Sequence, residues 1–299
     1  MRRLPQIALL SDGRRLHLQD GPIDLIVEAR GGGREVSAAY EAAARRFTGL
    51  LDELCTELTE LRKPAVATTC PLKGVVARRM HAAVAPYAAD DFITPMAAVA
   101  GSVAEEILGA MLSVARLDQA YVNNGGDIAL HLGQGEQFTV GLMDRPDRSG
   151  VMRTLTVEAD DPVRGVATSG RHGRSFSLGI ADAVTVLART ASQADAAATI
   201  IANAVDLPGH PAVVRCPANE IQPDSDLGAR LVTRGVGELS QADIAKALES
   251  GAERARQLFD RGLIEGAVLR LCGDMLVIGT KDIERHRPRL RPPESAIHA

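Results

Sequence analysis

The order of short and long apolar segments is the feature that most constrains how this chain can fold. Three short apolar runs come first, and the sequences Ser11-Asp12-Gly13 and Asp20-Gly21-Pro22 separate them. Such sequences favour tight turns because glycine and aspartate tolerate the backbone angles that a turn needs. The pattern therefore predicts a three-stranded meander formed by Gln6–Leu10, Arg15–Gln19 and Ile23–Ala29.

Helical periodicity replaces this pattern after the three glycines at 31–33. Apolar residues recur at spacings of three or four, the period of one helix face, at Tyr40, Ala44, Phe47, Leu51, Leu54, Leu58 and Leu61. We expect one long helix here and a second over residues 72–84. A third, Met96–Leu112, follows Thr94-Pro95, which supplies an N-cap and a proline at the first helical position. Its small residues between Ala97 and Ala104 would let the backbone come close to a sheet or to a ligand, with the sheet favoured. The same face could equally serve a subunit contact, so a homo-oligomer stays open.

Short strands then return. A second meander is expected over Ala120–Asn123, Ile128–Leu132 and Phe138–Leu142, and further strands over Thr154–Glu158, Gly165–Thr168, Val184–Ala188, Ala212–Arg215, Ala267–Leu271 and Met275–Ile278. Helices are expected over Ser192–Ala204 and Ser240–Phe259. This order predicts an α+β fold with antiparallel sheets rather than a doubly wound one. We expect a single domain over residues 1–283, in which meander-then-helix occurs twice and suggests duplicated subdomains. The Arg- and Pro-rich segment 284–299 is expected to be a mobile tail.

Composition excludes several classes of protein. The chain has 34 Lys+Arg against 38 Asp+Glu, and only five Phe, three Tyr and no Trp, which argues against a nucleic-acid partner. Its four cysteines are far apart, which argues against a zinc site on close Cys pairs and against a disulfide scaffold. We find no run of about 20 apolar residues and no signal-peptide core. The expectation is a cytoplasmic protein without a membrane partner.

The first candidate cluster is Asn123-Asn124-Gly125-Gly126-Asp127, between two apolar strands. Paired glycines let a ligand approach the backbone closely, and Asn and Asp supply hydrogen-bonding groups. The alternative is a plain hairpin turn, because Asn-Gly is the strongest short-range hairpin signal.

The second cluster is Ala167-Thr168-Ser169-Gly170-Arg171-His172-Gly173-Arg174-Ser175, which follows a strand. Hydroxyls, glycine-freed amides and the guanidinium groups of Arg171 and Arg174 are suited to a phosphate-like anion. It is neither a Walker A loop nor a Rossmann turn. A solvated basic loop remains the alternative, and His172 would act as a general base or phosphate ligand only in the functional interpretation.

The third cluster is Gln193-Ala194-Asp195-Ala196-Ala197-Ala198-Thr199 on an expected helix, where Asp195 and Thr199 are four residues apart on one face. A carboxylate and a hydroxyl there suit a hard cation such as Mg²⁺, with ligand phosphates in its other positions. The alternative is a capping box, Ser192-x-x-Asp195, at the helix start.

Taken together, N-x-G-G-D, then T-S-G after a strand, then A-D-A-x-x-T opening a helix resembles the ApbE superfamily, which includes FAD:protein FMN transferases. The similarity is clearest between Asn123 and Val205. Within the superfamily the chain looks closest to the UPF0280 proteins, on the segments Phe92–Gly101 and Ser175–Gly179. The resemblance implies two T-fold-like halves with antiparallel sheets packed by helices, and a flavin nucleotide, FAD or FMN, between them.

The same resemblance implies roles for the three clusters. Asn124, Gly125, Gly126 and Asp127 would border the nucleotide, Thr168, Ser169 and Gly170 would lie near its phosphates, and Asp195 and Thr199 would help to hold Mg²⁺. The transferases carry H-x-x-D-P-x-T-G between the last two motifs. Here residues 175–182 read Ser-Phe-Ser-Leu-Gly-Ile-Ala-Asp, without that His or the D-P-x-T-G element.

This departure leaves three functions open. The first is a flavin-nucleotide-binding protein that is a Mg²⁺-dependent transferase of the FMN or phosphoryl type. The second is a non-catalytic binder or carrier of a flavin or pterin in coenzyme metabolism. The third is a scaffold subunit whose site is vestigial.

Overall fold

A nine-stranded sheet runs through the whole protein, in which every neighbouring pair of strands is antiparallel. The structure, a computed structural model, describes residues 4–143, 151–279 and 297–298. The strands, in spatial order, are β1 (Gln6–Leu9), β2 (Leu16–Asp20), β3 (Ile23–Arg30), β4 (Gln119–Asn124), β5 (Asp127–Leu132), β8 (Gly165–Ser169), β9 (Ala183–Ala188), β12 (Gly266–Leu271) and β13 (Asp274–Ile278). The predicted α+β class with antiparallel sheets is confirmed.

The two halves of this sheet have the same connectivity. In the first half, β2 and β3 lead through helices to β4 and β5, and in the second half β8 and β9 lead through helices to β12 and β13. The halves join where β5 pairs with β8, through Ile128 opposite Val166 and Ala129 opposite Gly165. Strand ends from both halves therefore lie next to each other at the centre of the sheet.

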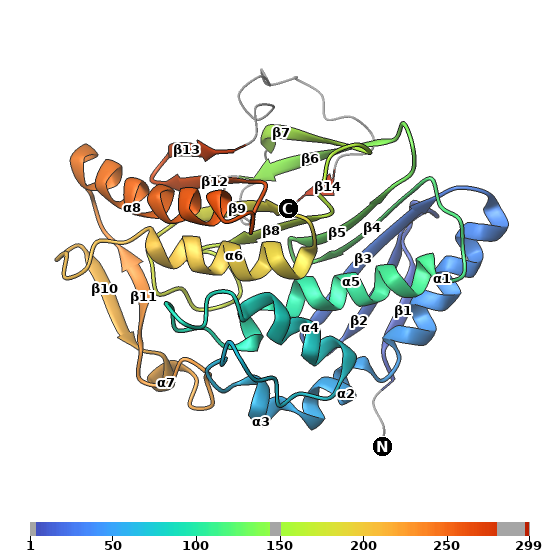
Figure 1. Cartoon of the computed structure of the whole chain (residues 1–299), viewed down its shortest axis with the longest axis horizontal. Coiled ribbons are helices and arrows are strands. Elements are labelled where there is room, and N and C mark those ends of the chain that lie inside the picture. The colour runs from blue at the N-terminus through green and yellow to red at the C-terminus, as the bar shows by residue number, and fades with distance from the viewer. Residues whose placement is uncertain (1–3, 144–150, 280–296, 299) are drawn as a thin grey trace.

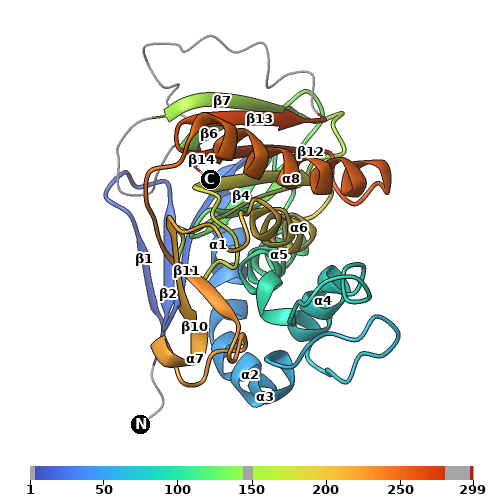
Figure 2. The same cartoon turned by 90° about the vertical axis from the view of Figure 1, so that its left-hand side faces the viewer.

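The helices cover one face of this sheet (Figure 1). Those packed directly on it are α1 (Gly33–Phe47), α5 (Val99–Leu112), α6 (Ala191–Ala204) and α8 (Gln241–Asp260). A 3₁₀ turn, η1 (Pro95–Ala98), leads into α5, and α4 (Val75–Val84) packs outside α5 and α6, farther from the sheet (Figure 2). The segment Pro95–Leu112 is long and apolar enough to cross a membrane by composition alone, but half of it is buried against other parts of the protein, where it serves as a core helix.

The single long helix expected over residues 40–61 is wrong. The segment forms the end of α1, then α2 (Leu50–Thr56) and α3 (Leu58–Leu61), because Gly49 takes a left-handed conformation with φ of 86° before α2. Phe47, Leu50, Leu54 and Leu61 nevertheless enter the same core cluster. Successive short helices on one core preserve the apolar spacing, so the periodicity could not reveal the break.

The third strand of the expected second meander is also placed wrongly. β6 (Gln137–Met143) does not join β5, whose other edge is taken by β8; it pairs with β7 (Val151–Glu158) and β14 (Ile297–His298) in a separate sheet. This small sheet lies over the face opposite the helices, where Phe138 and Val140 pack with Ile128 and Leu130. Apart from Ile297–His298, the expected tail 284–299 lies outside the described residues.

A two-stranded ribbon lies at the left-hand end of the molecule in Figure 1, below α8. It consists of β10 (Val213–Pro217), β11 (Leu231–Val236) and, between them, the short helix α7 (Ala218–Ile221). β11 was not expected from the sequence. Residues 213–236 are called the arm below.

Candidate functional site

Four segments from both halves meet at the centre of the sheet. The Asp127 carboxylate accepts a hydrogen bond from the backbone N–H of Thr168 at 3.2 Å, which joins the β4–β5 turn to the end of β8. The Asn124 side-chain amide donates to the Ala100 carbonyl of α5 at 3.2 Å. The Asp195 carboxylate of α6 accepts from the Gly101 N–H at 2.9 Å. The three clusters that were separate in the sequence are thus adjacent in the structure.

The β4–β5 turn is both a hairpin turn and part of this site. Gly125 and Gly126 have φ of 67° and 112°, which side-chain-bearing residues adopt only rarely. The Asn123 side-chain oxygen accepts from the Gly126 N–H at 2.8 Å and fixes the turn. A Cβ on Gly125 would lie 3.7 Å from the Arg174 guanidinium, so the exposed Arg174 lies against the turn.

Two half-buried carboxylates are the main electrostatic feature of the site. Burial raises the pKa of Asp127 to about 7, against the opposing effect of the Thr168 N–H. Burial, followed by the negative charge of Asp127, raises the pKa of Asp195 well above its usual range. Two like charges partly withdrawn from water repel each other, and a bound cation would relieve both effects.

Asp195 does not cap its own helix, so the capping-box interpretation is wrong. The N-cap of α6 is Thr190, whose hydroxyl accepts from the Gln193 N–H at 3.3 Å. The Ser192 N–H donates to the Glu105 carboxylate of α5 at 2.6 Å. With the helix start satisfied in this way, Asp195 is available to face α5, and Thr199 follows one turn later, half-buried.

The end of β8 supplies the polar groups next to Asp127. The Thr168 hydroxyl hydrogen-bonds with that of Thr185 on β9 at 2.9 Å, and Ser169 is the half-buried last residue of β8. Gly170 then comes so close to the next segment that a Cβ there would lie 2.6 Å from the Asp182 carbonyl oxygen. A backbone packed this tightly holds the amides of 168–170 in fixed positions.

The two arginines of the basic loop have different surroundings. Arg171 donates through Nε and Nη2 to one Asp182 oxygen, at 2.9 and 2.6 Å, and both side chains are largely buried. The other Asp182 oxygen accepts from the Cys272 N–H at 2.5 Å, and His172 Nε2 lies 3.3 Å from the first. Arg171 and Asp182 therefore anchor the loop, whereas Arg174 is the arginine exposed beside the glycine turn.

The donor set fits a hard cation that also binds ligand oxygens. Among the described residues, no group of three or more His, Cys, Asp or Glu side chains could hold a metal ion. Asp127 and Asp195 offer carboxylate oxygens and Thr199 a hydroxyl. Mg²⁺ is commonly bound in this way, by one or two carboxylates with phosphate oxygens and waters at the other positions.

The arm and Gly101 were not recognised as part of the site from sequence. On the arm, Thr233 donates from its N–H to the Ser177 carbonyl at 2.9 Å and from its hydroxyl to the Gly179 carbonyl at 2.8 Å. The arm thus holds the segment that follows the basic loop. The sequence signals for Gly101 were the small residues around it and its place in the segment Phe92–Gly101, whereas no sequence pattern pointed to Thr233.

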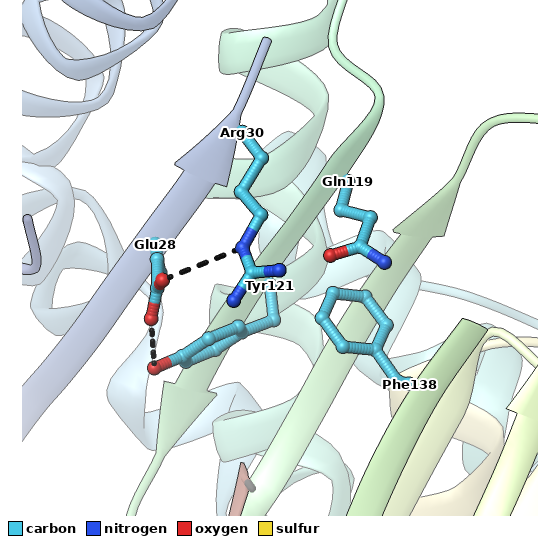
Figure 3. A pocket seen from close by; sticks show the side chains of 5 residues that line it. All are labelled: Glu28, Arg30, Gln119, Tyr121 and Phe138. Carbon is cyan, nitrogen blue, oxygen red and sulfur yellow. Dashed lines mark hydrogen bonds and ion pairs between the residues drawn. The ribbon is translucent and has the colours of Figure 1, made fainter. Parts of the chain in front are cut away.

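A small hollow on the opposite face of the sheet is not a ligand site. Glu28, Arg30, Gln119, Tyr121 and Phe138 line it (Figure 3), and its volume of about 10 Å³ is at the lower limit for a single water. The Tyr121 hydroxyl donates to Glu28 at 3.3 Å, and the Tyr121 and Phe138 rings meet edge to face. These contacts close the junction between β4 and β6.

Relatives known from sequence are UPF0280 proteins. That of Methanococcoides burtonii is 39% identical over 130 residues, which cover 40% of this chain and 49% of that protein. That of Methanothermobacter thermautotrophicus is 42% identical over 119 residues, which cover 39% of this chain and 44% of that protein. The chain spans about half the length of the curated relatives it matches.

The crystal structure of the Pseudomonas stutzeri flavinyl transferase ApbE in its apo form has the same fold. It matches with a TM-score of 0.51 at 13% identity, over 94% of this chain and 97% of that one. The predicted resemblance to ApbE proteins is therefore confirmed at the level of the fold. A model of the family described as AbpE bacteria matches residues 7–277, and this chain belongs to that family.

Proposed function

We propose that this protein binds a flavin nucleotide, FAD or FMN, together with Mg²⁺, where the β4–β5 turn, the end of β8 and helices α5 and α6 meet. The observation that carries the proposal is the pair Asp127 and Asp195, whose raised pKa values mark a place suited to a cation. The exposed Arg174 and the glycine turn beside them supply partners for a phosphate.

Asp195 and Thr199 would hold the ion, and Asp127 would face it from the β4–β5 turn. When bound, Mg²⁺ neutralises charge on phosphate oxygens, which is a large part of catalysis in phosphoryl-type transfer. The protein's own residues would contribute by holding the metal ligands and the phosphate partner in place. Gly101 orients Asp195, the Thr168 N–H orients Asp127, and Arg174 approaches the turn where the phosphates would lie.

A transferase that acts on FAD would release AMP as it passes FMN to an acceptor. The second candidate function, a non-catalytic carrier of a flavin or pterin, is favoured by the contacts of residues 175–182. The carbonyls of Ser177 and Gly179 accept hydrogen bonds from Thr233, and Asp182 is held by Arg171. This stretch replaces the His-containing element of the transferases, and these carbonyls and the Asp182 carboxylate are engaged in holding the fold.

Flavin titration with and without Mg²⁺, followed by chromatography for AMP and FMN, tests the proposal. We expect saturable FAD binding that strengthens with Mg²⁺ and is weakened at least tenfold in Asp195→Asn. The matched control is Asp260→Asn, at an exposed position on α8.

Two chemical outcomes separate the candidate functions. AMP release that Asp195→Asn abolishes supports the transferase, whereas binding without AMP supports the carrier. If neither FAD, FMN nor a pterin raises the melting temperature at saturating concentration, the proposal fails, because a ligand that binds the native state must stabilise it.

A further inference from the structure

A cavity of about 190 Å³ lies beside the loop that joins α3 to α4, the segment between these two labels in Figure 1. The loop residues Pro64, Val66, Thr69 and Pro71 line one side of it. His81 of α4 and the η1 residue Pro95 are also among its lining residues. None of these side chains belongs to the site proposed for the phosphates and the metal ion.

The loop is held open by specific hydrogen bonds. The Ala65 N–H donates to the Ile93 carbonyl at 2.8 Å, and His81 Nε2 lies 3.1 Å from the Val66 carbonyl oxygen. At the other end, the Glu57 carboxylate accepts from the backbone N–H groups of residues 73 and 74, both at 2.7 Å. Pinned at both ends, the loop cannot collapse into the space beside it.

The lining favours an uncharged flat ring with polar edges. Three proline rings and Val66, which is 54% exposed, present apolar surface, and exposed apolar surface around a hollow is typical of ligand grooves. Because the Val66 carbonyl can only accept, His81 Nε2 must donate to it, which leaves Nδ1 as an acceptor in the neutral ring. The Thr69 hydroxyl can donate or accept.

The charges at the cavity also favour a neutral ligand. Lys63 Nζ and a Glu60 carboxylate oxygen are 2.6 Å apart, so the two charges at the exposed rim balance each other. The positive charge of Lys63 is therefore already neutralised by Glu60, so an anionic group on the ligand is not needed to balance it.

The volume of the cavity limits which flat ring systems it can hold. A dry apolar cavity of about 150 Å³ accepts benzene. A volume of about 190 Å³ therefore has room for a fused two-ring system but not for the three fused, methylated rings of a flavin.

The position of the cavity relates it to the proposed site. Pro95 lies six residues before Gly101, and the rises of the 3₁₀ turn η1 and of the start of α5 put the two on the order of 10 Å apart. A ribose and its phosphates can bridge that distance. We propose that the cavity receives the purine ring of the nucleotide whose phosphates bind beside Arg174 and Asp195, an inference that rests on the proposed function.

The test uses AMP and adenosine as probes on the 299-residue chain. Ala65→Phe would fill the cavity while keeping the backbone bond to Ile93, and we expect it to weaken AMP binding at least tenfold by calorimetry. Ala67→Phe places the same ring on an exposed position of the same loop outside the lining, and AMP affinity should stay within twofold. Equal thermal unfolding of the two variants ensures that both are folded.

A second readout is the thiol of Cys70, which is exposed between the lining residues Thr69 and Pro71. Saturating adenosine should slow its alkylation at least threefold, whereas Cys55, exposed on α2, should react at an unchanged rate. Riboflavin, which carries three rings and no purine, should not protect Cys70.

The outcomes separate this inference from the proposed function. If FAD binds with Mg²⁺ but Ala65→Phe changes neither FAD nor AMP affinity, the purine subsite is overturned and the proposed function stands. Protection of Cys70 by riboflavin but not by adenosine also overturns it. If adenosine protects Cys70 but no flavin nucleotide binds, the purine subsite is supported and the flavin proposal fails.

Discussion

Asp195 of α6 accepts a hydrogen bond from the backbone N–H of Gly101 of α5 at 2.9 Å, across the contact between the two helices. A Cβ at position 101 would lie 2.3 Å from the Ala191 carbonyl oxygen, so only glycine fits between the helices. Each helix belongs to a different half of the sheet. The close packing that joins the two halves therefore also sets the direction of the carboxylate that we assign to Mg²⁺.

Gly101→Ala should disrupt the close packing of α5 against α6. The added methyl group forces α5 and α6 apart, and we expect a loss of about 2 kcal/mol or more in the free energy of unfolding, as overpacked interiors show. The stabilisation by Mg²⁺ and FAD should fall as well, because Asp195 loses its orienting N–H. Urea unfolding with and without these ligands measures both effects.

Gly109→Ala is the matched control, because Gly109 is exposed on the same helix and a Cβ there would meet nothing within 4 Å. Alanine should raise stability by about 0.5–1 kcal/mol through better helix propensity. A Gly101→Ala protein as stable as the parent would show that the helices can separate freely, contrary to our interpretation.

The raised carboxyl pKa values predict how stability depends on pH. Between the unfolded-state value of 3.8 and about 7, native Asp127 holds a proton that the unfolded chain has released. Native protein then binds more protons than unfolded protein, so the contribution of Asp127 to stability rises as pH falls from 8 to 5 and levels off below 3.8.

Asp127→Asn and Asp195→Asn should remove the cost in stability of holding two ionised carboxylates in this partly buried site. At pH 8, without ligand, we expect each variant to be more stable than the parent by about 1–2 kcal/mol, since solvent partly screens half-buried charges. The advantage should shrink as pH falls through about 7 and disappear only below 3.8. Denaturant unfolding at several pH values is the measurement, and variants that are less stable than the parent at pH 8 would contradict the repulsion.

Substituting the two arginines of the basic loop should have different effects: Arg171→Ala should lower stability, and Arg174→Ala should weaken binding. Arg171→Ala leaves the largely buried Asp182 without its guanidinium partner and should cost about 2 kcal/mol or more of stability. Arg174→Ala, at an exposed position, should change stability by less than about 0.5 kcal/mol. It should nevertheless weaken flavin-nucleotide binding roughly tenfold, the effect of one charged hydrogen bond. Similar binding losses with intact stability in both variants would argue against the anchoring role of Arg171.

The sequence predicted those parts of the fold that depend on local signals. The alternating runs and turn sequences located β1–β5, and the order of motifs carried the resemblance that the fold confirms. The pairing of β6 could not be predicted, because β5 and β6 each alternate apolar residues and only the competition of β8 for the β5 edge decides between them. Arg171 and Arg174 look equivalent in sequence because the partner of Arg171 is eleven residues away. Gly101 contacts Asp195 over 94 residues, which no local pattern records.

The arm is fastened to the first half of the protein by residues before α5. Thr94 is 2% exposed, and its hydroxyl donates to the Asp226 carboxylate at 2.5 Å. Near it, the Arg230 guanidinium lies 3.2 Å from the centre of the Phe92 ring. The same arm holds residues 177–179 through Thr233. Opening the arm should therefore loosen the segment that follows the basic loop.

Asp226→Ala should open the arm, because the buried Thr94 hydroxyl would lose its acceptor at a cost of about 1–3 kcal/mol in stability. We expect faster amide hydrogen exchange in residues 218–230 and 175–179, measured by mass spectrometry, with α6 and the central strands unchanged. Asp224→Ala is the control, since the carboxylate that pairs with Arg62 is 63% exposed and such pairs contribute little. Equal exchange in the two variants would mean that Thr94 does not fasten the arm. Faster exchange confined to 218–230 would mean that the arm opens without releasing the loop.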